Sequence, residues 1–183
     1  MSLISIQQAI VDGFKAALPA LQTCERHGGR FDAGELNRIS RRVPALFVAS
    51  LNIGDVRSGH DGLSCDVTYG AFLITKDQPG QSRDLVSLAL LDAALKTVAD
   101  NRWGLDAAET LPANISASNL YGANIDRQAV AMWGITWRQR MNAGSDVDDS
   151  ELADFLTFHA DYDVAPGVDD NPIATDHVAL PQE

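Results

Sequence analysis

The sequence predicts an α+β fold: a mixed, mostly antiparallel sheet of four to six strands packed with two or three helices on one face, plus an extended acidic C-terminal arm. Two segments place apolar residues three or four positions apart, which is typical of amphipathic helices. Several segments rich in β-branched and aromatic residues follow one another closely enough to pair as hairpins. The third observation is charge, because residues 141–183 hold 11 of the 25 acidic residues and no Lys or Arg.

The first third of the chain predicts a helix, a strand and a short helix. Over residues 5–18, apolar residues share one helical face, and a proline follows. Residues 21–26 predict a short strand that leads into a His-Gly-Gly turn. Asp32 and Glu35 resemble a capping box, so a short helix is expected over about 33–42. The end of this helix carries three cations, which suit the helix dipole there: Arg38, Arg41 and Arg42.

The middle of the chain predicts two strands and the main helix. Residues 45–53 and 64–76 are interpreted as strands joined by a hairpin-like loop, and both carry apolar residues on both faces, as central strands do. A helix capped by Ser82 or Asp84 is expected to run to about Asn101. We expect its buried stripe to comprise Leu85, Leu88, Leu91 or Asp92, Leu95, and Val98 or Ala99.

A second strand pair is expected at residues 115–120 and 128–140. Alternation along the second strand puts Ala131, Trp133, Ile135 and Trp137 on one face and Met132, Gly134, Thr136, Arg138 and Arg140 on the other. The two tryptophans are expected to pack against a helix layer, and the two arginines to lie exposed together at the strand's end. The predicted core therefore includes Trp133, Ile135, Trp137, Leu85, Leu88 and Leu91.

Charge divides the chain into an α+β body, residues 1–143, and an acidic strand and extended arm, residues 144–183. Residues 155–164, FLTFHADYDV, alternate between apolar and polar side chains, which predicts a strand that pairs. Three prolines in the last 19 residues indicate an extended strap, which we expect a neighbouring subunit to hold. The strand supplies Phe158, Tyr162 and Val164 as candidate contacts with another chain, and Asp161 and Asp163 on its polar face.

Composition and motifs argue against several functions. The acidic arm repels phosphate, so nucleic acid is not expected as its ligand. No apolar run is long enough to cross a bilayer, and no membrane partner is expected. The sequence contains no GxGxxG, P-loop or GxSxG motif, and its four histidines lie in separate regions. We therefore predict that the chain is not an enzyme and has no cofactor.

Two groups of residues have features of metal sites and would contradict this prediction. Cys24, His27, His60 and Cys65 have local spacings compatible with tetrahedral zinc, although the two halves lie far apart in the chain. The acidic run DVDDSE lacks the central Gly and final Glu of a calcium-binding EF-hand loop. Buried free cysteine and solvated acids are the commoner explanations, so no metal site is predicted.

Five segments together resemble the tail protein family of Mu-like phages that is thought to supply the tail terminator. These segments are AALPAL, GGRFDAGELNRISRRVPALFVA, ISASNLYG, AVAMWGITWRQR and FHADYDVAPG, and the likeness runs over most of residues 4–167. The resemblance implies a structural virion protein that forms a six-fold ring at the head-proximal end of the tail tube. Such a ring, assembled in the host cytoplasm, would stop tube polymerisation and join the tail to the head connector or stopper protein.

The same resemblance implies interaction surfaces in place of a reaction centre. Six copies with a net charge of −11 each have a net charge of 6 × −11 = −66, which would repel DNA passing through the bore without specific binding. The acids face the bore, the outside, or Arg38, Arg41 and Arg42 of an adjacent subunit, and the sequence leaves these alternatives open. Arg138 and Arg140 are candidates for contact with the tube. Two other functions remain: a different head-tail joining protein, such as a stopper or completion factor, or a small metal-dependent enzyme.

Overall fold

The computed structural model describes residues 1–31, 33–59, 62–77, 80–120 and 129–143, together with the backbone of two further strands, 157–162 and 174–179. The chain forms two compact units, Met1–Asp146 and Val147–Glu183. All the helices described below belong to the first unit.

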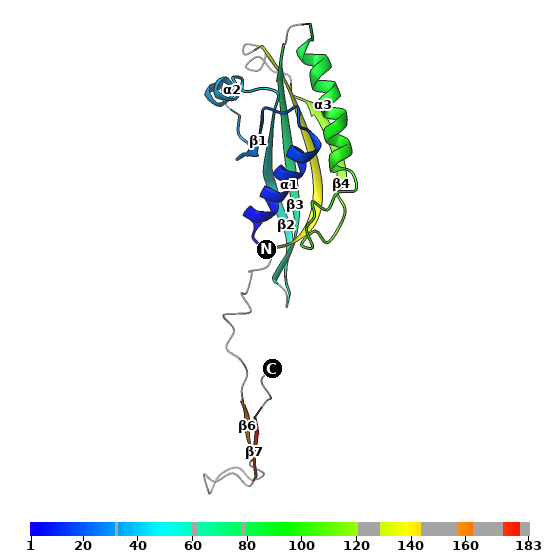
Figure 1. Cartoon of the computed structure of the whole chain (residues 1–183). Coiled ribbons are helices and arrows are strands. Elements are labelled where there is room, and N and C mark those ends of the chain that lie inside the picture. The colour runs from blue at the N-terminus through cyan, green and yellow to red at the C-terminus, as the bar shows by residue number, and fades with distance from the viewer. Residues whose placement is uncertain are drawn as a thin grey trace. The chain divides into compact units, whose positions relative to one another are not determined.

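The first unit is built on one five-stranded mixed sheet (Figure 1), which confirms the predicted α+β class. Its strands lie in the order β1-β2-β3-β5-β4, where β1 pairs with β2 in parallel and the other neighbours are antiparallel. The strands are β1 Thr23–Arg26, β2 Ala45–Gly59, β3 Gly62–Lys76, β4 Ala113–Asn119 and β5 Val130–Ala143. The described helices are α1 Leu3–Ala17, α2 Ala33–Ile39 and α3 Arg83–Val98.

Side-chain caps begin the two longer helices. The Ser2 hydroxyl accepts a hydrogen bond from the Ser5 N–H at 3.1 Å, and the Ser82 hydroxyl accepts one from the Leu85 N–H at 3.4 Å. Such bonds satisfy donors that the first turn of a helix leaves unpaired. Since α1 turns one continuous apolar stripe toward the sheet, its packing follows from sequence alone. That buried stripe consists of Ile6, Ile10, Val11 and Phe14.

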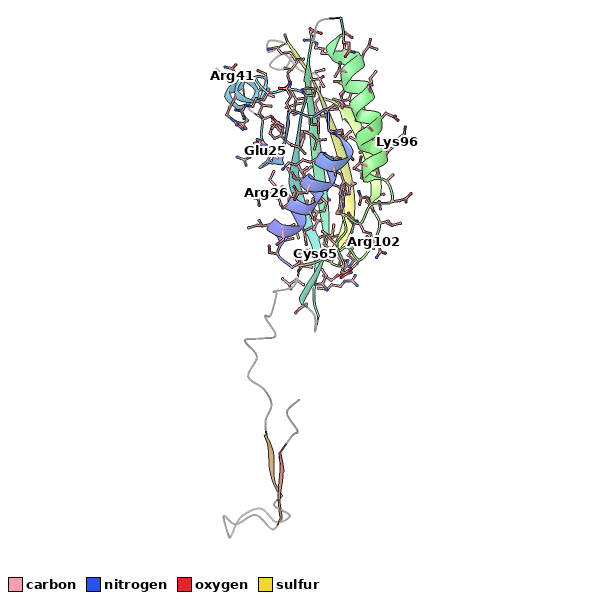
Figure 2. The ribbon with its side chains drawn as sticks, viewed as in Figure 1. Glu25, Arg26, Arg41, Cys65, Lys96 and Arg102 are labelled. Carbon is pink, nitrogen blue, oxygen red and sulfur yellow. The ribbon has the colours of Figure 1, made fainter. Side chains whose placement is uncertain are left out.

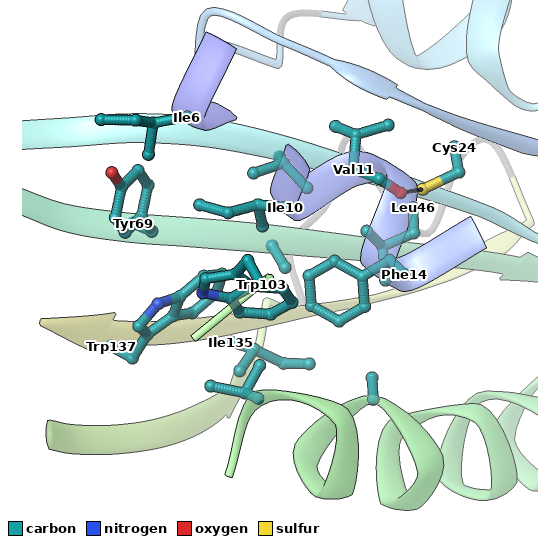
Figure 3. Close-up of a cluster of buried hydrophobic side chains, with 14 of the residues drawn as sticks. Ile6, Ile10, Val11, Phe14, Cys24, Leu46, Tyr69, Trp103, Ile135 and Trp137 are labelled. Atoms are coloured by element: carbon teal, nitrogen blue, oxygen red, sulfur yellow. Dashed lines mark hydrogen bonds between the residues drawn. The ribbon is translucent and has the colours of Figure 1, made fainter. Parts of the chain in front are cut away.

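The main core lies between the sheet and the helices α1 and α3. Figure 3 shows Trp103 and Trp137 close together with Phe14 beside them, and their ring centroids are 5.4 to 6.2 Å apart. The Trp103 indole N–H donates to the Gln139 side-chain oxygen at 2.9 Å, and the Gln139 amide donates to the Thr110 carbonyl at 2.8 Å. These bonds attach the segment between α3 and β4 to strand β5.

A second, smaller core lies on the opposite face of the sheet, beneath α2. The short helix α2 contributes Leu36 and Ile39, which cover Phe47 on β2 and Met132 on β5. The sequence predicted all helices on one face of the sheet, whereas α2 covers the opposite face. The alternation along β2 explains this difference, because Leu46 and Val48 belong to the main core while Phe47 points to the side that α2 covers.

The buried stripe of α3 differs from the predicted one. Leu85 and Leu88, expected in the core, are 69% and 50% exposed, whereas Leu91 is 6% exposed. Taking 100° per residue, the centre of the observed stripe is rotated by roughly 90° from the centre of the predicted one. Apolar residues surround most of this helix, so spacing alone fits more than one stripe. The positions that the helix buries are Ser87, Leu91, Ala94 and Val98.

The hairpin of β2 and β3 is longer than the sequence predicted. Both strands continue through the expected loop until Gly59 pairs with Gly62. The register shifts between Ser50 and Asn52 and again between Gly54 and Arg57. β-Bulges of this kind accommodate residues of low strand propensity, and the polar composition of this segment had indicated a loop.

The second unit contains a two-stranded antiparallel sheet of β6 Thr157–Tyr162 and β7 Ala174–Ala179. The sequence predicted a pairing strand over residues 155–164, and the partner of β6 is a strand of the same chain. The strap expected at residues 166–183 includes β7. Asp163 and Val164 lie outside the described residues, as do the side chains of the other proposed contact residues on this strand, Phe158, Asp161 and Tyr162.

Candidate interaction surfaces

A pocket of about 330 Å³ brings together the three arginines that the sequence placed at the end of α2. Ile39 and Phe47, both buried, supply apolar surface beside the guanidinium groups. We call this site the arginine pocket. Its lining residues come from β1, β2, α2 and the turn after α2: Thr23, Glu25, Arg38, Ile39, Arg41, Arg42 and Phe47.

Backbone hydrogen bonds fix the turn that carries Arg41 and Arg42. The Arg42 N–H donates to the Ile39 carbonyl at 3.0 Å, which closes the turn after α2. The Thr23 hydroxyl donates to the Arg42 carbonyl at 3.1 Å, and the Gln22 N–H donates to the Pro44 carbonyl at 2.8 Å. These hydrogen bonds therefore hold the backbone that carries Arg41 and Arg42 against β1.

One arginine of the pocket is already paired. Arg38 donates two hydrogen bonds to the Glu35 carboxylate, Nε to Oε2 at 3.0 Å and Nη2 to Oε1 at 2.7 Å. His27 Nδ1 accepts from the Gly29 N–H at 3.0 Å, so His27 Nε2 is the donor to Glu35 Oε1 at 3.1 Å. The bonds from Arg38 first, and then the bond from His27, lower the pKa of Glu35 to about 2.

The other two arginines are available to a ligand. Arg41 and Arg42 are exposed, and their guanidinium groups make no hydrogen bond or ion pair with the described part of the chain. Figure 2 shows Arg41 beside α2 and Glu25, which also lines the pocket, on β1. Lys96 and Arg102 lie away from them, on the side of α3. Two cations beside an apolar floor suit an acidic peptide.

The second predicted pair, Arg138 and Arg140, lies in an ion-pair network at the end of β5. Arg140 Nη1 lies 2.8 Å from Asp55 Oδ2 and 3.4 Å from Asp66 Oδ1, and Arg140 Nε lies 3.3 Å from Glu109 Oε2. Arg138 pairs with Asp66 as well. The bond from Arg140 is the largest cause that lowers the pKa of Asp55.

The prediction that Arg140 is exposed is wrong. Its side chain is 18% exposed, while that of Arg138 is 51% exposed. Because Arg140 joins Asp55 on β2, Asp66 on β3 and Glu109 ahead of β4, it holds the end of the sheet together. Arg138 remains accessible to a partner, but its charge is shared with Asp66.

The sheet ends in two unlike edges. On one side, β1 pairs only with residues 45–48 of β2, so residues 49–59 have no strand partner on that side within the described chain. Three large apolar side chains of this uncovered part are at least partly exposed: Leu51, Ile53 and Val56. On the other side, among the strands that the structure describes, β4 pairs only with β5, and its sequence ANISASN contains no charge. An uncharged open edge such as that of β4 favours pairing with another strand.

Cys24 and Cys65, two of the four residues considered as zinc ligands, do not converge. Cys24 pairs with Leu46, which pairs with Leu73 on β3, and Cys65 lies eight residues from Leu73, roughly 27 Å along the strand. Burial raises the pKa of Cys24 to about 11 and also raises that of Cys65, which disfavours the thiolate that binds metal. His60 lies outside the described residues, and no group of three possible ligands occurs within them.

A larger cleft of about 500 Å³ lies between α1 and β1, where Gln7, Lys15, Cys24 and His27 are among the lining residues. The Cys24 thiol donates to the Val11 carbonyl at 3.6 Å, and His27 is bonded to Glu35. Neither side chain is placed to activate the other. Gln7, on the α1 side of the cleft, donates to the Val48 carbonyl at 2.8 Å.

Comparison with known proteins assigns no function to these surfaces. Neither a scan against models of protein families nor a search of curated proteins finds a match to the chain. Among the helices that the structure describes, none has both the length and the apolar character that a membrane crossing requires.

Proposed function

We propose that this chain is a subunit of a phage tail terminator, a six-fold ring that caps the tail tube and joins the tail to the head connector. The observation that carries the proposal is the pair of unlike open edges of one rigid sheet. A chain with two different, complementary surfaces associates head to tail, and such contacts generate a closed ring when the rotation between copies closes. Two edges of one kind would instead favour a two-fold dimer.

The segments that resemble the Mu-like tail protein family support this proposal. GGRFDAGELNRISRRVPALFVA includes α2, most of the residues that line the arginine pocket and the start of β2, and ISASNLYG includes most of β4. AVAMWGITWRQR forms most of β5, the strand that joins β4 to the rest of the sheet. Two of the five segments therefore include residues of the surfaces proposed for assembly, the arginine pocket and the β4 edge.

Assembly onto a tube also gives the acidic end of the chain a role. A ring of six chains, each with a net charge of −11, has a net charge of 6 × −11 = −66, and acids near the bore repel the phosphates of passing DNA. Arg138, which is half exposed, is a candidate contact with the tube. A stopper or completion factor shares these needs, so the position of the protein along the tail distinguishes the alternatives.

The open edge of β4 provides a direct test. The Leu120 N–H donates to the Met132 carbonyl, so alternation places the N–H of Ala117 on the side away from β5. Ala117→Pro removes that outward donor while the ladder to β5 remains. Ala117→Ser, which keeps the donor, is the matched control.

We expect electron microscopy to show rings at one end of purified tail tubes for the unaltered protein and for Ala117→Ser, and few or none for Ala117→Pro. Circular dichroism must show that the proline variant is folded. Absence of the unaltered protein from tube ends would overturn the terminator proposal. Rings of normal number with Ala117→Pro would exclude β4 as an assembly edge.

A further inference from the structure

We infer that the arginine pocket receives the acidic C-terminal segment of a neighbouring copy, through the run Asp146 to Glu151. This inference rests on the proposed assembly of copies and names the contact between them. The pocket offers Arg41 and Arg42 as exposed cations without a partner among the described residues, and a buried apolar floor of Ile39 and Phe47.

The positive charge of Arg41 and Arg42 predicts an acidic occupant for the pocket. The run DVDDSE carries four acidic residues in six positions, and residues 141–183 contain no Lys or Arg that would compete with the pocket's arginines. Carboxylates pair well with the planar guanidinium group, which offers several N–H donors in a fixed geometry. Val147 within the run supplies an apolar side chain of a size that suits the floor.

Reach decides that the occupant belongs to another copy. Phe47 in the pocket is level with Phe72 on β3 and Gly134 on β5. From Gly134 to the end of β5 at Ala143 is nine residues, roughly 31 Å along the strand and away from the pocket. The pocket also lies on the β1 side of the sheet, three strand spacings or about 14 Å from β5.

The chain beyond β5 is too short to return to its own pocket within this run. Glu151 is eight residues past Ala143, and eight residues span at most about 28 Å when fully extended. Combining the two displacements gives roughly 34 Å between backbones, whereas Asp149, six residues past Ala143, spans at most about 21 Å. Asp146, Asp148 and Asp149 therefore do not reach the pocket of their own chain even when the lengths of both side chains are added. A neighbouring copy has no such restriction, and the contact joins two different surfaces, as a ring requires.

Cross-linking between two distinguishable chains tests this contact. An untagged Arg42→Cys chain is mixed with a larger tagged Asp149→Cys chain and treated with a short thiol-reactive cross-linker. Both native cysteines are buried, so they add little background. The matched control replaces Arg42→Cys with Arg102→Cys, which moves the thiol to another exposed arginine on the α3 side.

We expect a cross-linked band at the summed mass for the Arg42 pair, at least tenfold stronger than for the Arg102 pair, with and without tail tubes. High salt should weaken it because it screens exposed charges. Charge reversal gives a second readout, in which association of the two chains is measured by analytical ultracentrifugation because positions 42 and 149 no longer carry Cys. Arg41→Glu with Arg42→Glu should abolish association, and Asp148→Lys with Asp149→Lys in the other chain should restore it. Reversing Lys96 and Arg102 should have no effect.

Equal cross-linking of the Arg42 and Arg102 pairs, or failure of the second reversal to restore the contact, would overturn the inference. If rings still cap the tubes while the charge-reversed protein behaves as the unaltered one, the terminator proposal stands and the pocket assignment falls. A specific cross-link in a protein that never binds tube ends supports the pocket and contradicts the terminator.

Discussion

Two leucines of α3 provide a sharp test of how this helix is oriented. Leu88 and Leu91 are three positions apart, and the sequence predicted both in the core. In the structure Leu91 is 6% exposed and packs in the main core, whereas Leu88 is 50% exposed. Replacing each with Ala removes the same atoms from different surroundings, so each substitution is the control for the other.

The expected losses follow from burial. Three buried carbons contribute about 2.4 kcal/mol of transfer free energy, and the cavity left in a packed interior adds about 1 kcal/mol. Leu91→Ala should therefore lower the free energy of unfolding by about 3 kcal/mol. Leu88 keeps half its surface in water and leaves no cavity, so Leu88→Ala should cost about 1 kcal/mol or less.

Urea unfolding followed by tryptophan fluorescence measures this difference, because Trp103 and Trp137 lie in the main core. In thermal unfolding, the same losses correspond to a fall in Tm of about 6 to 12 °C for Leu91→Ala and about 2 to 4 °C for Leu88→Ala. Equal losses, or a larger loss for Leu88→Ala, would refute the observed orientation of α3 and favour the stripe that the sequence predicted.

Three further predictions concern other features. In Gly13→Ala, the new Cβ would lie 2.9 Å from Cε3 of Trp103; we expect a net loss of about 1 kcal/mol in urea unfolding, because overpacking outweighs the better helix propensity of Ala, and a more stable variant would contradict this packing. Gln139→Leu leaves the Trp103 N–H without its acceptor and should cost about 2 to 4 kcal/mol; a loss below about 1 kcal/mol would show that the bond is dispensable. The pKa of Glu35 is lowered from 4.5 to about 2, chiefly by Arg38, so its contribution to stability is present above pH 4.5 and is lost as the pH falls toward 2; Glu35→Gln should flatten that part of the stability profile, and an unchanged slope would argue against the ion pair.

Much of the fold was predictable because its local signals agree. The helix α1 has a single apolar stripe followed by Pro19, and β5 alternates cleanly between two faces. The α3 stripe was not predictable, because its leucines and alanines surround the helix and only the sheet selects which of them is buried. The length of the β2 and β3 hairpin was missed since bulges admit polar residues that otherwise indicate a loop.

The candidate surfaces were predictable only in part. The cluster of Arg38, Arg41 and Arg42 is a sequence feature, but the pocket exists because β1 pairs with the start of β2 and brings Thr23 and Glu25 alongside. Arg140 was misjudged because Asp55, its closest carboxylate partner, lies 85 residues away in the chain. Such distant charge pairs leave no local signal in a single sequence.

Electron cryomicroscopy of tail tubes incubated with the full chain tests the central proposal most directly. The proposal predicts a closed six-fold ring at one tube end, in which β4 of one copy lies beside the uncovered part of β2 of the next. Tubes with bare ends, or a chain bound along the tube wall without a ring, would contradict it.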